Sequence, residues 1–272
     1  MQHDESGAFV LSIRVVDVEE EHWRYVSLCT HVDEENPDNL RAAELRLKWL
    51  RASDVKTKVA IDGDGKPLGF IHVVPIEAPL SGMVGRNFMV IPCLTLGYQL
   101  VYGRRHGTGI GRGLIQAVEE EAKERGFKGL AVYAYGGDFW FMPSAFFQRL
   151  GFKQVGGSNI WVKKWGEAED PTSHRAHYEY KPIPGKVVID YFWAPFCFTV
   201  CKEVLNIRQV VSEFGDRVEL REYRADDPEI AARHGLFRAL FINGEHKDWG
   251  HEALKEDLRK EIRKSLQGSP SS

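Results

Sequence analysis

The spacing of apolar residues along the chain predicts a mixture of strands and helices. Near the N-terminus every second residue is apolar, which is typical of a half-buried strand: Phe9, Leu11, Ile13 and Val15. Asp17 and Glu20 follow with the spacing of a capping box, so a short helix is predicted to begin there.

A longer helix is predicted from residue 37, because Asn36 can cap it and Pro37 suits its first turn. The runs "TKVAID" and "PLGFIHVVPIEA" flank a "GDGK" turn and predict a hairpin. The next apolar run, residues 87–102, contains Pro92 and Gly97. Because both residues weaken strand pairing, we expect a bulge or a parting of strands there.

A glycine-rich segment, "RRHGTGIGRGL" at residues 104–114, comes next and leads into an amphipathic helical pattern. A strand ("KGLAVYAY"), a short helix ("PSAFFQRLGF") and a last strand ("NIWVKKW") complete this half of the chain. Residues 166–184 are then polar, contain three prolines and predict a linker. A new alternation of strands and helices follows, so two unlike domains are predicted, at residues 1–165 and 185–272.

Composition narrows the class of partner. The chain has 272 residues and a formal net charge of -3, so no overall field attracts nucleic acid or a membrane surface. No apolar run has the length of a membrane span, and the N-terminus lacks the pattern of a secretory signal. Four cysteines do not form a disulfide framework. We expect a cytoplasmic protein with reduced thiols; its oligomeric state stays open, a homodimer included.

The glycine-rich segment is a candidate phosphate site. A helix N-terminus offers unpaired N–H groups and positive potential, and glycines let the backbone approach a phosphate closely. Arg104, Arg105 and Arg112 can add charge. A dinucleotide fingerprint fits poorly, because antiparallel hairpins precede the segment, and a Walker loop would need G-K-[ST], which is absent. A glycine-rich turn without any ligand is the remaining alternative.

"LVYGRRHGTGIGRGLIQAVEEEA" resembles the acetyl-CoA loop of the GNAT acyltransferase superfamily, whose pattern is [QR]-x-x-G-x-[GA], and "AFFQRLGFKQV" resembles its later signature. The resemblance spans about residues 8–165. It implies an N-acetyltransferase with acetyl-CoA as co-substrate and an unidentified acceptor, a small-molecule amine or a thiol-containing compound. The residues implied in binding CoA are Leu100, Val101, Tyr102, His106, Gly107, Thr108, Gly109, Ile110, Gly111 and Arg112.

Two positions depart from the superfamily's pattern. His106 stands at the Arg/Gln position, and Phe147 stands where many members place a tyrosine that protonates the CoA thiolate. Asp138 is the best-placed carboxylate for a general base, although an aspartate beside two glycines also suits an ordinary turn. His72 and Glu77, expected on the third strand, are weaker candidates. Cys93 is either a small buried residue or a thiol near the acyl group.

"FWAPFCFTVCK", residues 192–202, resembles the thioredoxin motif, except that three residues rather than two separate Cys197 from Cys201. A thiol at a helix N-terminus is activated, and residues four apart share a helix face, so a disulfide is within reach. No proline occurs between "HGLFR" and "ALFINGE", where thioredoxins have a cis-proline loop. A non-redox module, thiol redox chemistry and soft-metal binding stay open; no zinc site is predicted, because no second cysteine pair is nearby.

The predicted fold class is therefore α/β: a GNAT fold, with a mixed and mostly antiparallel sheet flanked by helices, followed by a small thioredoxin-like α/β domain. This combination resembles the YoaP-like acetyltransferases. The predicted function is transfer of an acetyl group from acetyl-CoA to an amine by direct attack. The alternative is a thiol-redox or soft-metal-binding protein that uses Cys197 and Cys201, in which the GNAT domain only binds CoA.

Overall fold

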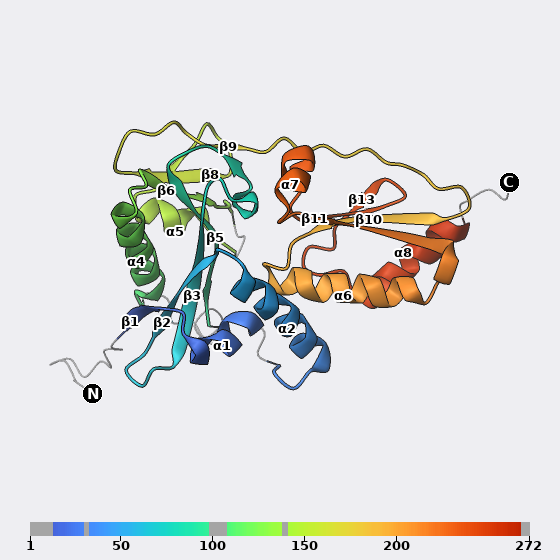
Figure 1. Cartoon of the computed structure of the whole chain (residues 1–272), viewed down its shortest axis with the longest axis horizontal. Coiled ribbons are helices and arrows are strands. Elements are labelled where there is room, and N and C mark those ends of the chain that lie inside the picture. Colours follow the sequence, from blue (N-terminus) through green and yellow to red (C-terminus); the bar gives the residue numbers. More distant parts are fainter. Residues whose placement is uncertain (1–12, 30–32, 98–107, 138–140, 268–272) are drawn as a thin grey trace. The chain divides into compact units, whose positions relative to one another are not determined.

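The computed structural model describes residues 13–29, 33–97, 108–137 and 141–267 (Figure 1). Its contacts divide the chain into two compact units. Unit 1 contains residues 1–32, 54–77 and 83–172, and unit 2 contains residues 33–53, 78–82 and 173–272. The units are thus interleaved along the sequence, because two short segments of the N-terminal half belong to unit 2.

A seven-stranded sheet forms the centre of unit 1, in the order β1-β2-β3-β5-β6-β8-β7. Its strands are β1 (Arg14–Asp17), β2 (Lys56–Ile61), β3 (Pro67–Pro75), β5 (Phe88–Leu96), β6 (Gly129–Tyr133), β7 (Lys153–Gln154) and β8 (Ile160–Lys164). Neighbours pair antiparallel except β5 and β6, which are parallel. Two short strands, β4 (Met83–Val84) and β9 (Thr172–Ser173), make a separate pair. The predicted mixed, mostly antiparallel sheet is confirmed.

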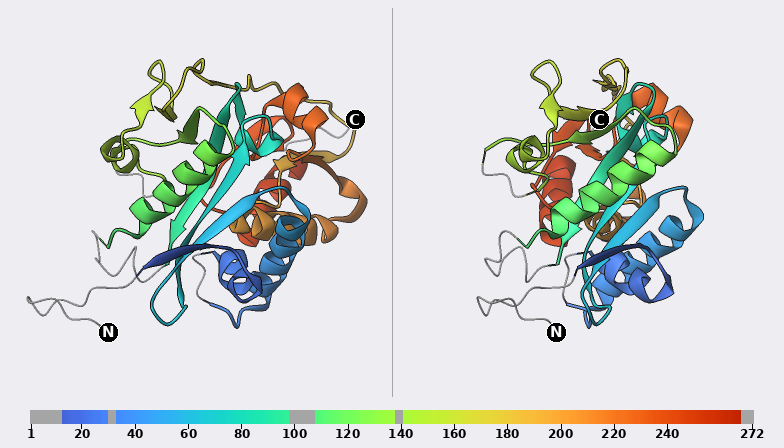
Figure 2. Two further views of the ribbon diagram at one scale, coloured as in Figure 1. Left: turned by 60° about the vertical axis from the view of Figure 1, so that its left-hand side comes forward. Right: turned by 90° about the vertical axis from the view of Figure 1, so that its left-hand side faces the viewer.

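Helices cover both faces of this sheet. Helix α4 (Ile110–Glu124) lies along one face, as Figure 2 shows, and its apolar side packs with the short helix α5 (Ser144–Arg149) on a core of sheet residues. Turn η1 (Glu20–His22) and helix α1 (Trp23–Leu28) serve the other face, where the Tyr25 ring meets the Phe70 ring edge-on. The β strands and α4 therefore sandwich an apolar layer, as their predicted patterns require.

Strands β5 and β6 part after a short shared stretch. Their pairing runs from Phe88↔Gly129 to Ile91↔Val132 and ends there. In the β3–β5 ladder the register shifts between His72 and Val74, so β5 carries an extra residue at Ile91–Pro92. Beyond it, β5 continues beside β3 as far as Leu96, while β6 continues beside β8. The bulge and parting predicted from Pro92 are confirmed.

The predicted capping box at Asp17 and Glu20 is wrong. Strand β1 continues through Asp17, which lies opposite Lys58 and accepts a hydrogen bond from Lys58 Nζ at 2.8 Å. Glu19 caps η1 instead, and its backbone N–H donates to His22 Nδ1 at 3.0 Å. Because Asp17 is paired with Lys58 in the β1–β2 ladder, the chain turns into η1 two residues later, at Glu19.

Unit 2 is built on a four-stranded sheet in the order β11-β10-β12-β13. Its elements are α2 (Pro37–Ala52), η2 (Pro79–Ser81), β10 (Val187–Trp193), α6 (Phe198–Ser212), η3 (Gly215–Arg217), β11 (Val218–Arg224), α7 (Pro228–His234), β12 (Ala239–Ile242), β13 (Glu245–Lys247) and α8 (Lys255–Gln267). Strands β10 and β11 are parallel, and the other pairs are antiparallel. Figure 1 shows α6 and α8 on one face and α7 on the other.

Helix α2 belongs to unit 2 although it precedes β2 in the sequence. Asn36 caps it as predicted, since its side chain accepts the N–H of Asp38 at 2.9 Å. The helix packs along α6, and Trp49 Nε1 donates to Asp226 Oδ2 at 2.8 Å. Helix α2 therefore packs on a helix from the C-terminal half of the chain.

Part of the predicted linker lies on the unit 2 sheet. Tyr178 donates a hydrogen bond to Asp190 Oδ2 at 2.8 Å and stacks on Phe241 with ring centroids 3.7 Å apart. Arg221 Nη1 donates to the carbonyl of Lys181 at 2.9 Å. The segment from about residue 173 therefore contributes to unit 2, whereas the predicted domain boundaries themselves stay a prediction. No helix among the described residues is long and apolar enough to span a membrane.

Candidate functional site

Helix α4 begins with an uncapped first turn. Gly109 is its N-cap with φ +78°, and no side-chain cap hydrogen bond is made to the helix by the described residues. The first helical bond runs from Gly113 N to Gly109 O at 2.9 Å, so the N–H groups before Gly113 have no partner within the helix. Such groups and the helix dipole attract anions, so this end of α4 is a candidate anion site.

Gly109 and Gly111 are glycines for two different structural reasons. Gly109 is exposed, lies in the left-handed region, and has no other atom within 4 Å of where a Cβ would be, so backbone conformation alone requires glycine. A Cβ on Gly111 would lie 3.0 Å from the Phe146 ring, so that glycine permits close packing on α5. Thr108 is half-buried, Ile110 is buried in the core, and Arg112 is exposed on the first turn.

Several predicted site residues lie outside the described residues. They are Leu100, Val101, Tyr102, His106, Gly107 and Asp138. The structure therefore brings together Thr108, Gly109, Ile110, Gly111 and Arg112 at the start of α4. It also describes both flanks of the loop that contains Asp138.

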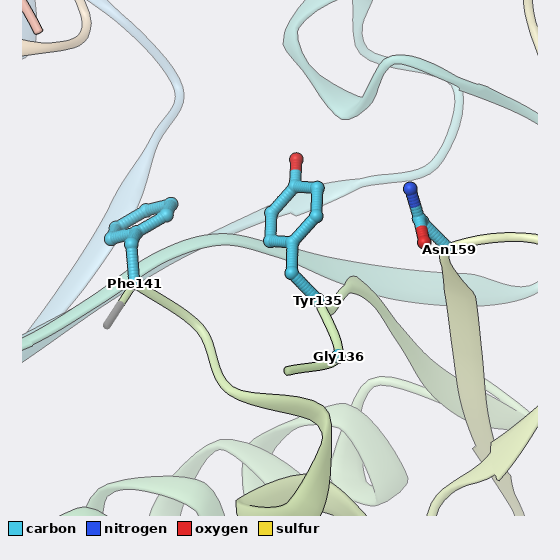
Figure 3. A pocket seen from close by; sticks show the side chains of 4 residues that line it. All are labelled: Tyr135, Gly136, Phe141 and Asn159. Carbon is cyan, nitrogen blue, oxygen red and sulfur yellow. The ribbon is translucent and has the colours of Figure 1, made fainter. Parts of the chain in front are cut away.

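A cavity of about 500 Å³ lies at those flanks, lined by Tyr135, Gly136, Phe141 and Asn159 (Figure 3). Tyr135 follows β6, and Asn159 precedes β8. The Tyr135 side chain lies between those of Phe141 and Asn159, and its hydroxyl points away from its own backbone. The backbone closes the loop tightly, because Tyr135 N donates to the carbonyl of Met142, a residue with φ +50°.

Tyr135 and Asn159 are polar groups that the sequence prediction missed. Burial raises the pKa of the Tyr135 hydroxyl, so the phenol stays protonated at neutral pH and can donate a hydrogen bond. The available signal was an aromatic residue at the very end of the predicted strand "KGLAVYAY", whose observed strand β6 ends earlier, at Tyr133. Phe147, by contrast, is fully buried between Phe146 and Phe152 and is a core residue.

The other candidate bases are placed differently. His72 lies on β3 as predicted and is fully buried, with its Nδ1 2.7 Å from Thr57 Oγ1. Glu77 is exposed and lies beyond the end of β3 at Pro75, so its predicted position on that strand is wrong. Cys93 lies on β5 and is buried. His72 and Cys93 are opposite each other in the β3–β5 register.

Cys197 and Cys201 lie at the N-terminus of α6. Cys197 is the half-buried N-cap, and Cys201 N donates to Cys197 O at 3.0 Å, one helical turn later. Cys201 Sγ donates to the carbonyl of Pro195 at 3.5 Å. Burial raises the pKa of the Cys201 thiol to about 12, although the Arg46 and Arg224 charges oppose this. Both cysteines are free thiols in this structure.

Buried charges surround this thiol pair. Arg46 of α2 is almost fully buried and donates from Nε to the carbonyl of Phe196 at 2.8 Å. Glu203 of α6 accepts hydrogen bonds from the Tyr191 hydroxyl at 2.5 Å and from Arg238 Nε at 3.1 Å. Because each buried charge is partnered, the network is stable in a low-dielectric interior. Among the described residues, no group of three or more His, Cys, Asp or Glu side chains is arranged to hold a metal ion.

Solved structures resemble part of the chain. A GNAT family acetyltransferase from Brucella melitensis in complex with acetyl-CoA shares 18% identity over 60% of this chain and 96% of its own, with a TM-score of 0.40. The GNAT family N-acetyltransferase YhbS from Escherichia coli, in complex with CoA, shares 17% over 60% and 85%, with a TM-score of 0.39. The PaiA N-acetyltransferase from Thermoplasma acidophilum, in complex with coenzyme A, shares 16% over 57% and 99%, with a TM-score of 0.39.

No curated protein matches the chain. A sequence model of the acetyltransferase (GNAT) family matches residues 16–152, which is half of the chain and includes strands β2, β3, β5 and β6, helix α4, and Tyr135, Gly136 and Phe141 of the cavity. The chain therefore belongs to the acetyltransferase (GNAT) family of enzymes.

Proposed function

We propose that this enzyme transfers an acetyl group from acetyl-CoA to a small-molecule amine. The single observation that carries the proposal is the open first turn of α4, where exposed Gly109 leaves unpaired N–H groups beside a parted pair of strands. Binding of a pyrophosphate here is supported by the donors and positive potential of the turn and by the open space around the Cβ position of Gly109 among the described residues.

In this proposal the backbone from His106 to Arg112 holds the pyrophosphate, and Leu100 to Tyr102 hold the pantetheine chain. When bound, acetyl-CoA supplies an activated acyl group with a thiolate as leaving group. Asp138 is proposed as the general base, and its loop borders the cavity that Tyr135 and Phe141 line. This cavity is proposed to receive the amine, since its aromatic walls suit an apolar acceptor body and Asn159 can orient a polar group.

The part of unit 2 at residues 185–272 is proposed to be a thioredoxin-like domain, with residues 166–184 as the connection that precedes it. Its strand order, its one parallel pair and the position of Cys197 at a helix start support this assignment. The alternative in which Cys197 and Cys201 carry the main function is not favoured, because family membership assigns the chain to acetyltransferases. The two thiols are proposed as an accessory thiol site of the domain.

The test is release of CoA from acetyl-CoA in the presence of a panel of amines. We expect at least one amine to accelerate thiol release and to gain an acetyl group in the product. Gly109→Glu is expected to abolish both signals, because a carboxylate at the first turn repels phosphate. Saturable acetyl-CoA binding without acceleration by any amine in a broad panel would contradict the transfer reaction and leave a CoA-binding regulator.

A further inference from the structure

The chain leading into α5 takes the edge of the sheet that β5 leaves. The last pair of β5 and β6 includes Val132, and Tyr135 comes three residues later. Tyr135 N donates to the carbonyl of Met142 at 3.0 Å, and the Tyr135 carbonyl accepts from Ser144 N at 2.7 Å. Successive N–H groups of an extended chain point to opposite edges, and Ala134 N donates to the residue that precedes β8, so these two bonds lie on the β5 edge. The parting of β5 and β6 therefore extends for about 10 Å and ends at Tyr135.

Tyr135 lines the cavity at this end of the parting. The cavity has a volume of about 500 Å³, and the Tyr135 side chain lies in it between those of Phe141 and Asn159 (Figure 3). Of the four described lining residues, only Tyr135 carries a proton that an acid can transfer. Burial raises the pKa of its hydroxyl above the ordinary value of 10.0, and no charged side chain of the described residues contributes to that change. The phenol therefore keeps its proton at neutral pH.

Helix α5 contacts both Tyr135 and the proposed phosphate site. Ser144, which donates to the Tyr135 carbonyl, begins α5. Two residues later the Phe146 ring lies 3.0 Å from where a Cβ on Gly111 would be, in the first turn of α4. The next residue, Phe147, is fully buried and has no proton to donate. A CoA molecule with its pyrophosphate at α4 and its arm along the parting of β5 and β6 would bring its sulfur toward Tyr135.

We propose that Tyr135 is the catalytic acid of the acetyl transfer and that its hydroxyl donates the proton that the CoA sulfur receives. The inference rests on the proposed function and deepens it, because it names the residue that assists the leaving group. Direct attack of the amine on acetyl-CoA is retained.

The transfer is balanced in atoms and charge. The neutral amine nitrogen attacks the acetyl carbonyl carbon, and a C–N bond forms. The C–S bond to CoA breaks, its electron pair stays on sulfur, and the Tyr135 proton transfers to that sulfur. The amine loses one proton to the proposed base Asp138, which releases it to solvent, and the Tyr135 oxygen regains one proton from solvent. The products are the acetylated amine and CoA with a free thiol.

The first test needs no amine and measures contact with the sulfur. Calorimetric titration compares CoA with desulfo-CoA, in which hydrogen replaces the thiol group, on the full wild-type chain and on Tyr135→Phe. We expect the preference of the wild type for CoA over desulfo-CoA to be about three- to tenfold larger than that of the variant, because one hydrogen bond to the sulfur is lost. The four affinities form a cycle that separates the interaction of hydroxyl and sulfur from a general change in binding.

Turnover separates an acid from a residue that only packs. With an amine identified by the panel, Tyr135→Phe is expected to lower kcat by about a hundredfold, the size of a lost general acid, and to change KM for acetyl-CoA by less than about threefold. Replacement of Tyr135 by 3-fluorotyrosine, whose phenol is more acidic, is expected to move the alkaline loss of activity to lower pH. Tyr180→Phe is the matched control and should keep full activity, since Tyr180 is a half-buried tyrosine of unit 2 whose hydroxyl donates to Asn243.

The outcomes are distinguishable. An equal preference for CoA over desulfo-CoA in the wild type and in Tyr135→Phe, or a full kcat in that variant, would overturn this inference and leave the proposed function intact. An unchanged pH profile with 3-fluorotyrosine would do the same, because the proton would then come from another group. If Tyr135→Phe does not fold, the 3-fluorotyrosine chain, which keeps the hydroxyl, decides the question. Absence of acetyl-CoA binding, or binding without acetylation of any amine, would overturn the proposed function and the inference together.

Discussion

Helices α4 and α6 have the same length, 15 residues, and neither has a side-chain N-cap, yet their N-cap residues differ in backbone conformation and exposure. The first turn of α4 starts at exposed Gly109 in the left-handed region. The first turn of α6 starts at Cys197 with extended backbone and continues into buried residues. Both helix ends carry the same positive potential. Among the described residues the difference lies in exposure: Gly109 at the start of α4 is exposed, whereas Cys197 at the start of α6 is half-buried and lies one turn before the buried thiol of Cys201.

The enclosed end of α6 should show a large difference between its two thiols. At pH 8 we expect iodoacetamide to modify Cys197 first. Cys201 should react on the order of a thousandfold more slowly than a free thiol compound, because each unit of raised pKa lowers the thiolate fraction tenfold. Timed peptide mapping measures both rates. Cys197→Ser should leave Cys201 equally slow, and comparable rates at the two cysteines would show that the α6 end is open.

A variant of Arg46 tests whether helix α2 shields the two thiols at the start of α6. Arg46→Met should lower the free energy of unfolding by about 2–3 kcal/mol, because a buried charged hydrogen bond to the Phe196 carbonyl is lost. Arg41→Met is the matched control on the same helix, since Arg41 is exposed and pairs with Asp38 three residues away, and should change the free energy of unfolding by less than about 0.5 kcal/mol. Denaturant unfolding measures both. Equal losses would mean that α2 does not cover the thiols.

Alkaline pH should weaken the fold through Cys201. Its pKa is raised to about 12 in the fold, above the ordinary value of 9.0, so the contribution of the neutral thiol to stability is complete below pH 9. Between pH 9 and 12 the unfolded chain loses this proton and the folded chain keeps it, so stability falls by about 1.4 kcal/mol per pH unit. Cys201→Val should remove this component from the pH profile of unfolding. An unchanged profile in that variant would place the thiol in a more solvated site.

The open end of α4 should respond only slightly to its nearest exposed charge. Arg112→Ala should weaken acetyl-CoA binding by about two- to fivefold, corresponding to about 0.3–1 kcal/mol for a charge near a helix end. Added salt should reduce the difference, because exposed charges are screened. Arg125→Ala, at the opposite end of the helix, should leave affinity unchanged, since Arg125 pairs with Glu121. Calorimetric titration measures both variants.

The sequence predicted best where one local pattern decides the structure. The Asn36 cap with Pro37 fixed the start of α2, and Pro92 marked the bulge in β5. Alternating and helical periodicities also placed most strands and helices, because each reports which face of an element is buried.

The sequence did not predict features that depend on contacts between segments far apart in the chain. Nothing in residues 37–52 indicates that α2 packs on α6, because an apolar helix face does not name its partner. The sequence also did not predict that Thr57, His72 and Cys93 are neighbours on one face of the sheet. Their proximity depends on the registers of two strand pairs rather than on any spacing along the chain. The cavity beside Tyr135 likewise requires Asn159 from another strand connection.

The most direct test of the account is thermal unfolding with and without acetyl-CoA for three proteins: the wild type, Gly109→Glu and Gly126→Glu. Gly126 follows the other end of α4, has φ +83°, and has open space around its Cβ position, so both variants share the backbone strain and the added charge. At a hundred times the Kd, the wild type and Gly126→Glu should each gain about 2.7 kcal/mol. Gly109→Glu should gain nothing. An equal gain in Gly109→Glu, or no gain in the wild type, would contradict the claim that the open end of α4 holds the phosphates of CoA.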